Sequence, residues 1–126
     1  MHHLAGRVEC LLGDGLEAVA SAGAFDLIVA NPPYIPSAEI DLLEPEVQRF
    51  DPRRALDGGP DGLAFYRILA RNAGVMLKTD GQLIIEFGDG QETALQPLFE
   101  SENWIVESIL KDYTQRPRLL VAHKKM

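Results

Sequence analysis

The sequence predicts an α/β fold, in which a partial, mostly parallel sheet ends in an antiparallel hairpin. Short apolar runs of strand length alternate with segments whose apolar residues recur at helical spacing. The last two such runs alternate polar and apolar residues, as paired strands do. No repeat, low-complexity tract or Gly/Ser linker divides residues 1–126, so we expect one domain.

The first half of the chain contains two predicted strands. Residues 7–12 form an apolar run that ends in the turn sequence Gly13-Asp14-Gly15, and residues 16–22 can form a short helix. Residues 26–30 read Asp-Leu-Ile-Val-Ala, a continuous apolar run that is typical of a strand buried on both faces. Such a strand implies a parallel sheet.

The middle of the chain begins with a long irregular segment. Residues 31–62 hold six of the eight prolines and lack sustained periodicity, apart from one turn of helix expected near residues 40–43. Residues 63–77 have helical spacing, and Lys78-Thr79-Asp80-Gly81 is expected to end that helix. Residues 82–87 then form another buried strand.

The last part of the chain predicts a helix and a hairpin. Residues 92–102 form a helix with Leu95, Leu98 and Phe99 turned inward. Residues 104–110 and 118–123 alternate as strands and are expected to pair antiparallel.

Composition narrows the class of partner. The chain is 46% hydrophobic and 25% charged, with a formal net charge of −7, which opposes a large phosphate-binding surface and favours protein or small-molecule substrates. No apolar run approaches the length of a membrane span, and the start lacks the pattern of a signal peptide, so we expect a cytoplasmic protein. The single cysteine, Cys10, lies in an apolar run and is expected to be buried and inert.

The sequence Asn31-Pro32-Pro33-Tyr34 directly follows a predicted buried strand, where open α/β sheets place their ligand crevice. Two consecutive prolines fix their own φ and restrict the residue before them, so the loop is stiff. A stiff loop can hold two acceptors, the Asn31 side-chain oxygen and the Pro32 carbonyl, toward the two hydrogens of a flat amide or amine.

Such a loop suits methylation of a nitrogen. An amide nitrogen is a poor nucleophile, so the useful work is to orient it in line with a sulfonium methyl group and to stabilise developing positive charge. Tyr34 can stack on the flat group, and its ring near a sulfonium gains about 0.5–2 kcal/mol of cation–π attraction. The alternative is a plain proline-rich turn with a packed tyrosine, and four residues alone do not decide between the two.

Downstream motifs extend the pattern, namely Glu44-Pro45-Glu46-Val47, Phe50-Asp51-Pro52, Ala55-Leu56, Gly58-Gly59-Pro60-Asp61-Gly62-Leu63, Glu86-Phe87-Gly88, Gln91, Asp112-Tyr113 and residues 116–119. Together with the loop they resemble the release factor N5-glutamine methyltransferases, which are class I S-adenosylmethionine-dependent methyltransferases with a Rossmann-like sheet. The resemblance covers nearly the whole chain and implies that it is the C-terminal portion of such an enzyme.

The resemblance implies roles for particular residues. The glutamine side chain would be bound by Asn31, Pro32, Pro33 and Tyr34. Among these, Asn31, Pro32 and Tyr34 would be catalytic. S-adenosylmethionine would be bound by Asp14, Gly15 and Asn31, although an acidic turn explains Asp14 almost equally well. Gly58-Gly59-Pro60-Asp61-Gly62 would be either a flexible loop that folds over the bound peptide or a plain turn before a helix.

The resemblance also exposes a departure. No Gly-x-Gly-x-Gly turn precedes the strand at residues 7–12, and no acidic residue follows a second strand to hold the cofactor ribose. We expect both upstream of Met1, together with two central strands and a helical domain that grips the release factor. The chain alone is therefore expected to bind cofactor weakly, to show little methyl transfer, and to self-associate through an unpaired sheet edge.

Two other functions stay open from the sequence. The same loop can serve an amino-methyltransferase that acts on RNA or DNA bases, because a base amine is also a flat NH2 donor, but the acidic charge disfavours it. A non-enzymatic remnant or interaction module would explain the missing glycine turn. The leading prediction has a release factor as partner and no membrane partner.

Overall fold

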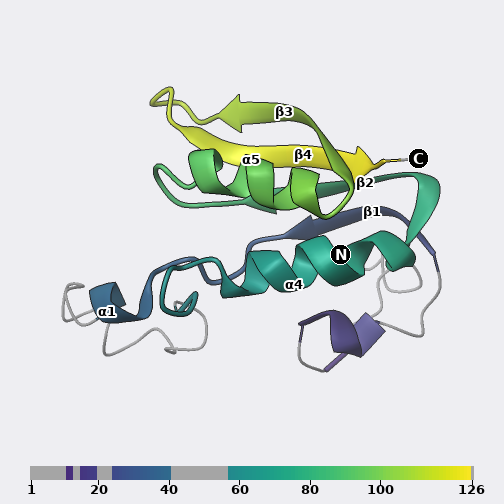
Figure 1. The fold of residues 1–126 in the computed structure, drawn as a ribbon, viewed down its shortest axis with the longest axis horizontal. Coiled ribbons are helices and arrows are strands. Elements are labelled where there is room, and N and C mark those ends of the chain that lie inside the picture. Colours follow the sequence, from purple (N-terminus) through teal and green to yellow (C-terminus); the bar gives the residue numbers. More distant parts are fainter. Residues whose placement is uncertain (1–10, 13–14, 20–23, 41–56, 126) are drawn as a thin grey trace, which may run out of the picture.

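The structure is a computed structural model that describes residues 11–12, 15–19, 24–40 and 57–125. Its elements in chain order are η2 (Gly15–Val19), β1 (Phe25–Ala30), α1 (Ser37–Ile40), α4 (Ala64–Asn72), η3 (Ala73–Met76), β2 (Leu77–Glu86), α5 (Glu92–Ser101), β3 (Trp104–Lys111) and β4 (Pro117–Lys124). Figure 1 shows α4 and α5 lying along the strands of one sheet.

The sheet mixes parallel and antiparallel strands in the order β1-β2-β4-β3. Strand β1 pairs parallel with β2, as the sequence predicted, whereas β4 pairs antiparallel with both β2 and β3. The predicted α/β class and the closing hairpin are confirmed. The expectation of a mostly parallel sheet is wrong for the described residues, because β4 returns between β2 and β3 and makes two antiparallel pairings.

One hydrophobic cluster joins the helices to the sheet. Helix α4 contributes Tyr66, Leu69, Ala70 and, just beyond its end, Ala73, which recur at the spacing of one helix face. Strand β2 contributes Leu83 and Ile85, and it continues into Phe87 with the two-residue period of a strand. From α5 and the hairpin come Leu95, Phe99, Trp104, Leu120 and Ala122.

Strand β1 departs from the predicted burial on both faces. Ile28 and Ala30 pack against the cluster, but Leu27 is 48% exposed and Val29 is 67% exposed. Within the described residues no strand pairs with β1 on the side away from β2. In the part of the chain that the structure describes, the outer edge of β1 is therefore unpaired, and the face that carries Leu27 and Val29 is exposed.

The boundary between the helix at 63–77 and the following strand also differs from the prediction. Helix α4 gives way to the 3-10 turn η3, and β2 already begins at Leu77, so residues 78–81 lie inside the strand. Phe25 pairs with Leu77, and Leu27 pairs with Gln82. Between these two pairs β1 moves on by two residues and β2 by five, so β2 contains extra residues at this point, as in a bulge. The predicted turn residues are taken up by this irregularity instead of ending the helix before a later strand.

The remaining elements follow the predicted ones closely. Helix α5 and the strands β3 and β4 match the expected helix and hairpin, and Leu95 and Phe99 are fully buried. The short helix expected at 16–22 is the 3-10 helix η2, and α1 covers part of the turn expected near 40–43. The strand at 7–12 lies mostly outside the described residues, as does Cys10. Among the residues described, no helix has the length and apolar character needed to cross a membrane.

Candidate functional site

Three loops lie at one end of the strands of the sheet. Asn31-Pro32-Pro33-Tyr34 follows the carboxyl end of β1, and residues 87–91 follow the carboxyl end of β2, which is parallel to β1. Because β4 is antiparallel to β2, the turn that precedes β4, residues 112–116, lies at the same end of the strands. The candidate site is predicted from the sequence at this end.

Three glycines leave room for the Asn31–Tyr34 loop. A Cβ atom at Gly58 would lie 2.8 Å from the Pro33 carbonyl oxygen, and one at Gly62 would lie 2.5 Å from the Tyr34 carbonyl oxygen. A Cβ atom at Gly88 would lie 2.7 Å from Cδ2 of the Tyr34 ring. The loop thus lies so close to these three backbones that larger side chains would displace it.

The segment 57–62 forms a hydrogen-bonded turn that leads into α4. The Gly58 N–H donates to the Ile35 carbonyl (2.7 Å), and the Ser37 N–H donates to the Gly59 carbonyl (2.8 Å). The Gly58 carbonyl in turn accepts from the Ala64 N–H at 2.9 Å. Gly59 and Gly62 have φ of 89° and 78°, which favour glycine. These bonds support the plain turn rather than the flexible loop that was its alternative.

Gln91 connects the three segments around the loop. Its Nε2 donates to the Tyr34 carbonyl at 3.1 Å and to the Gly62 carbonyl at 3.4 Å, while its Oε1 accepts from the Gly88 N–H at 2.8 Å. In the sequence, Gln91 stands out only as part of a motif. A glutamine between a glycine-rich turn and a helix does not by itself predict a structural role. Its contacts with Tyr34 and Gly62, which are distant in the sequence, follow only from the structure.

The predicted acceptors of the loop lie next to a hydrogen-bonded segment. The carbonyls of Tyr34, Ile35 and Pro36 all accept hydrogen bonds. Among the described residues, neither the exposed Asn31 side chain nor the Pro32 carbonyl is hydrogen-bonded. The two groups predicted to hold a substrate amide are therefore free to accept its hydrogens.

Tyr34 is half-buried and packs against the hydrophobic cluster at the end of β2. At the end of β2, the fully buried Tyr66 donates its hydroxyl hydrogen to the Glu86 carbonyl at 2.7 Å. Burial raises the pKa of the Tyr66 phenol well above its usual range, with smaller electrostatic contributions from Tyr34 and Glu86. Tyr66 therefore stays neutral, and its hydrogen bond joins α4 to the end of β2.

The hairpin turn at the same edge is organised by Asp112. Its carboxylate accepts from Thr114 Oγ1 (2.7 Å), the Thr114 N–H (2.8 Å), the Arg116 N–H (3.1 Å) and Arg118 Nε (3.0 Å). These donors, Thr114 Oγ1 foremost, hold the pKa of Asp112 well below its usual range. Arg116 and Arg118 also pair with Asp89, which ties the hairpin to the turn after β2.

The cofactor residues predicted from the resemblance are only partly described. Gly15 begins η2, is exposed and has φ of 54°, and no described atom lies within 4 Å of a Cβ placed on it. Asp14 lies outside the described residues. Among the residues that are described, no hydrogen bond joins Gly15 to the Asn31 loop.

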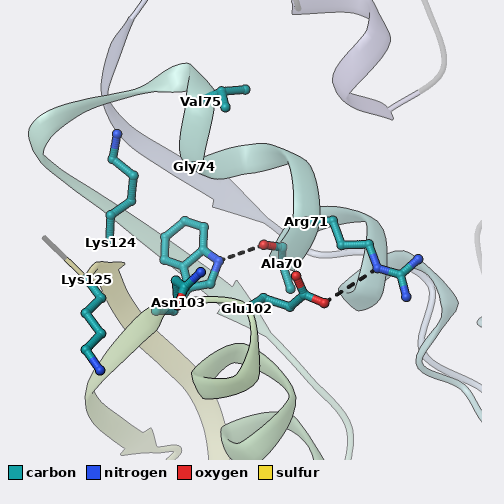
Figure 2. Close-up of a pocket in the computed structure, with 9 residues that line it drawn as sticks. Ala70, Arg71, Gly74, Val75, Glu102, Asn103, Lys124 and Lys125 are labelled. Carbon is teal, nitrogen blue, oxygen red and sulfur yellow. Dashed lines mark hydrogen bonds and ion pairs between the residues drawn. The ribbon is translucent and has the colours of Figure 1, made fainter.

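A hollow of about 260 Å³ lies at the other end of the strands, between the end of α4 and the start of β3. Figure 2 shows its wall, where Trp104 donates to the Ala70 carbonyl at 2.8 Å and Arg71 pairs with Glu102 at 3.7 Å. The Lys124 ammonium donates to the Leu77 carbonyl at 3.0 Å. None of the predicted site residues lines this hollow, and its polar groups largely satisfy one another.

Comparison with known proteins identifies relatives over most of the chain. A protein of Rhodospirillum rubrum is 53% identical over 108 residues, which are 86% of this chain and 33% of the relative. A protein of Caulobacter vibrioides is 43% identical over 118 residues (94% and 40%), and one of Moorella thermoacetica is 42% identical over 123 residues (97% and 43%). All three are named release factor glutamine methyltransferase. No family model matches the chain. The chain thus spans between 33% and 43% of the length of these curated relatives.

Proposed function

We propose that this chain, which belongs to the release factor glutamine methyltransferase family over the part that it spans, forms the amide-binding side of an enzyme that methylates N5 of a glutamine in release factors. The observation that carries this proposal is the pair of free acceptors, the Asn31 side chain and the Pro32 carbonyl, on a loop that Gln91 holds at the Tyr34 carbonyl. We further propose that the mixed sheet is the C-terminal part of a class I methyltransferase sheet.

The chemistry follows from the two acceptors. A primary amide has two hydrogens in one plane, and two fixed acceptors can hold both at once. Accepting these hydrogens orients the amide nitrogen and stabilises the positive charge that it gains on methylation. The half-buried Tyr34 ring, fixed by its packing against Gly88, can cover the face of the same flat group.

The cofactor of this family is S-adenosylmethionine, which when bound would supply the methyl group. Two observations support room for such a group, namely the exposed Asn31 side chain and, separately, the open space around Gly15. We propose that Asn31 faces both substrate and cofactor, and that Gly15, with Asp14, lines the adenine.

The net charge favours a protein substrate. With a net charge of −7, the chain repels the phosphate backbone of a nucleic acid. A glutamine-bearing loop of a protein does not require a positively charged surface. Methylation of a nucleic-acid base by the same loop is the alternative that the test below addresses.

The test uses the natural protein at its full length. It is incubated with methyl-labelled cofactor and either a release factor or total RNA and DNA, and the labelled residue is located by mass spectrometry. We expect label on a glutamine side chain of the release factor. Label that enters only nucleic acid would overturn the proposed substrate.

We also propose that the open edge of β1 lets two copies of this chain associate. Leu27 and Val29 are exposed on one face of this strand, and the described residues leave its outer edge unpaired. Sedimentation of the purified chain should show a dimer that the double substitution Leu27→Lys and Val29→Lys disperses. A wild-type chain that is monomeric at high concentration would contradict this proposal.

A further inference from the structure

Gln91 lies at the centre of the contacts that hold the Asn31–Tyr34 loop. It immediately precedes α5, yet its side chain reaches Tyr34, 57 positions away, and Gly62, 29 positions away. Its third partner, the Gly88 N–H, belongs to the glycine against which the Tyr34 ring packs. One side chain therefore binds all the segments that confine the loop.

We propose that Gln91 is a positioning residue, whose carboxamide fixes the Asn31–Tyr34 loop so that the Asn31 oxygen and the Pro32 carbonyl stay aimed at the substrate amide. This inference rests on the proposed function, because it concerns the same loop. It adds a residue that does not touch the substrate and acts through the Tyr34 carbonyl.

The three partners require a carboxamide in particular. Two of them are carbonyl oxygens, which need a donor, and the third is an N–H group, which needs an acceptor. A glutamine offers two donor hydrogens and an acceptor oxygen on one flat group. The opposite orientation of this amide would place its oxygen against two carbonyls and its NH2 against an N–H, so the network fixes which end is which.

A purely helix-capping role does not account for these contacts. The Gln91 backbone already serves the start of α5, because its carbonyl accepts from the N–H groups of Ala94 (3.0 Å) and Leu95 (2.9 Å). The Gln91 N–H donates to the Gly88 carbonyl at 3.2 Å. Any residue with this backbone makes the same bonds, so the side chain is left to hold the loop.

Two variants separate positioning from folding. Gln91→Ala removes all three side-chain bonds, and Gln91→Glu keeps the shape but places a carboxylate against two carbonyl oxygens. Lowering the pH to the ordinary glutamate pKa of about 4.3 protonates that carboxylate and returns one donor. Gln96→Ala is the matched control, since Gln96 is an exposed glutamine on α5, the helix that Gln91 precedes.

The first measurement needs no substrate. In NMR spectra of the chain, the Tyr34 ring signals and the exchange rate of the Gly58 amide, which bonds to Ile35, report the loop. We expect Gln91→Ala to speed that exchange and to shift the ring signals, and Gln91→Glu to return toward wild type as the pH falls from about 8 to about 4. Unchanged spectra in both variants would overturn the positioning role, whatever the reaction.

The second measurement uses the full-length natural protein with a release factor. We expect Gln91→Ala to lower kcat about 100-fold, because a misplacement of about 1 Å costs that much, and to change KM far less. Gln96→Ala should match wild type. Equal kcat in Gln91→Ala and Gln96→Ala would overturn the inference. If wild type itself methylates no glutamine, the proposed function fails, and the NMR result still decides the role of Gln91 in holding the loop.

Discussion

The Tyr34 ring lies directly against the backbone of Gly88, so that a Cβ atom at position 88 would come within 2.7 Å of Cδ2 and 2.8 Å of Cε2 of the ring. Residues 34 and 88 follow two neighbouring parallel strands. Their contact fixes the aromatic end of the loop, and through it the orientation of the candidate amide site.

Replacing Gly88 by alanine tests this contact. The substitution should destabilise the protein by about 1–3 kcal/mol, because the ring must move or the backbone must shift. It should also weaken binding of a glutamine side chain, since the displaced ring no longer covers it. Urea unfolding followed by circular dichroism gives the first quantity, and KM for a release factor gives the second.

The matched control is Gly74→Ala in η3, at the other end of the strands. A Cβ there would lie 3.3 Å from Cδ of Lys124, part of a flexible side chain that can move aside. Stability within about 0.5 kcal/mol of wild type is expected. If Gly88→Ala and Gly74→Ala behave alike, the Tyr34–Gly88 contact does not order the loop.

Tyr34 should act through its ring rather than its hydroxyl. Tyr34→Phe keeps the packing on Gly88 and the flat face, so activity should stay close to wild type. Tyr34→Leu removes the aromatic face and should raise the activation free energy by about 0.5–2 kcal/mol. Steady-state kinetics of both variants distinguish the two roles, and equal losses would show that the hydroxyl is required.

Asp112 makes the hairpin turn sensitive to acid. Its pKa is depressed in the folded protein, so its contribution to stability is present above the unfolded pKa of about 3.9 and is lost as the pH falls below that value. Asp112→Asn should therefore be less stable than wild type at neutral pH, with a difference that shrinks below about pH 4. Unfolding curves measured from pH 3 to 7 show this convergence, and a difference that grows with acidity would contradict it.

Trp104 anchors the hairpin to α4 away from the site. Its indole N–H donates to the Ala70 carbonyl at 2.8 Å, and its ring meets Phe99 edge-on with centroids 5.9 Å apart. Trp104→Phe should cost about 1–3 kcal/mol through the lost buried hydrogen bond while leaving kcat near wild type. A large loss of kcat without a loss of stability would place Trp104 in the reaction instead.

The sequence predicts those features of the fold that depend on local pattern. Helical spacing located α5, strand alternation located β3 and β4, and the apolar runs at 26–30 and 82–87 located β1 and half of β2. The insertion of β4 beside β2 was missed, because strand order depends on contacts between distant segments. The early start of β2 was missed because turn-forming residues can also occupy a strand irregularity.

For the candidate site, the sequence located the loop but not what holds it. Asn31 to Tyr34 stood out because prolines after a buried strand are a local signal. The roles of Gly88 and Gln91 depend on approaches between residues 34, 62, 88 and 91, which no spacing along the chain reveals. Asp14 and Gly15 remain predictions.

The most direct test of the amide-binding site is the rate constant of methyl transfer in the Asn31→Ala variant of the full-length natural protein. Loss of one preorganised polar contact at a reacting centre costs about 2.7–4 kcal/mol, so kcat for a release factor should fall about 100- to 1,000-fold while the fold, seen by circular dichroism, is retained. A kcat close to that of wild type would contradict the account.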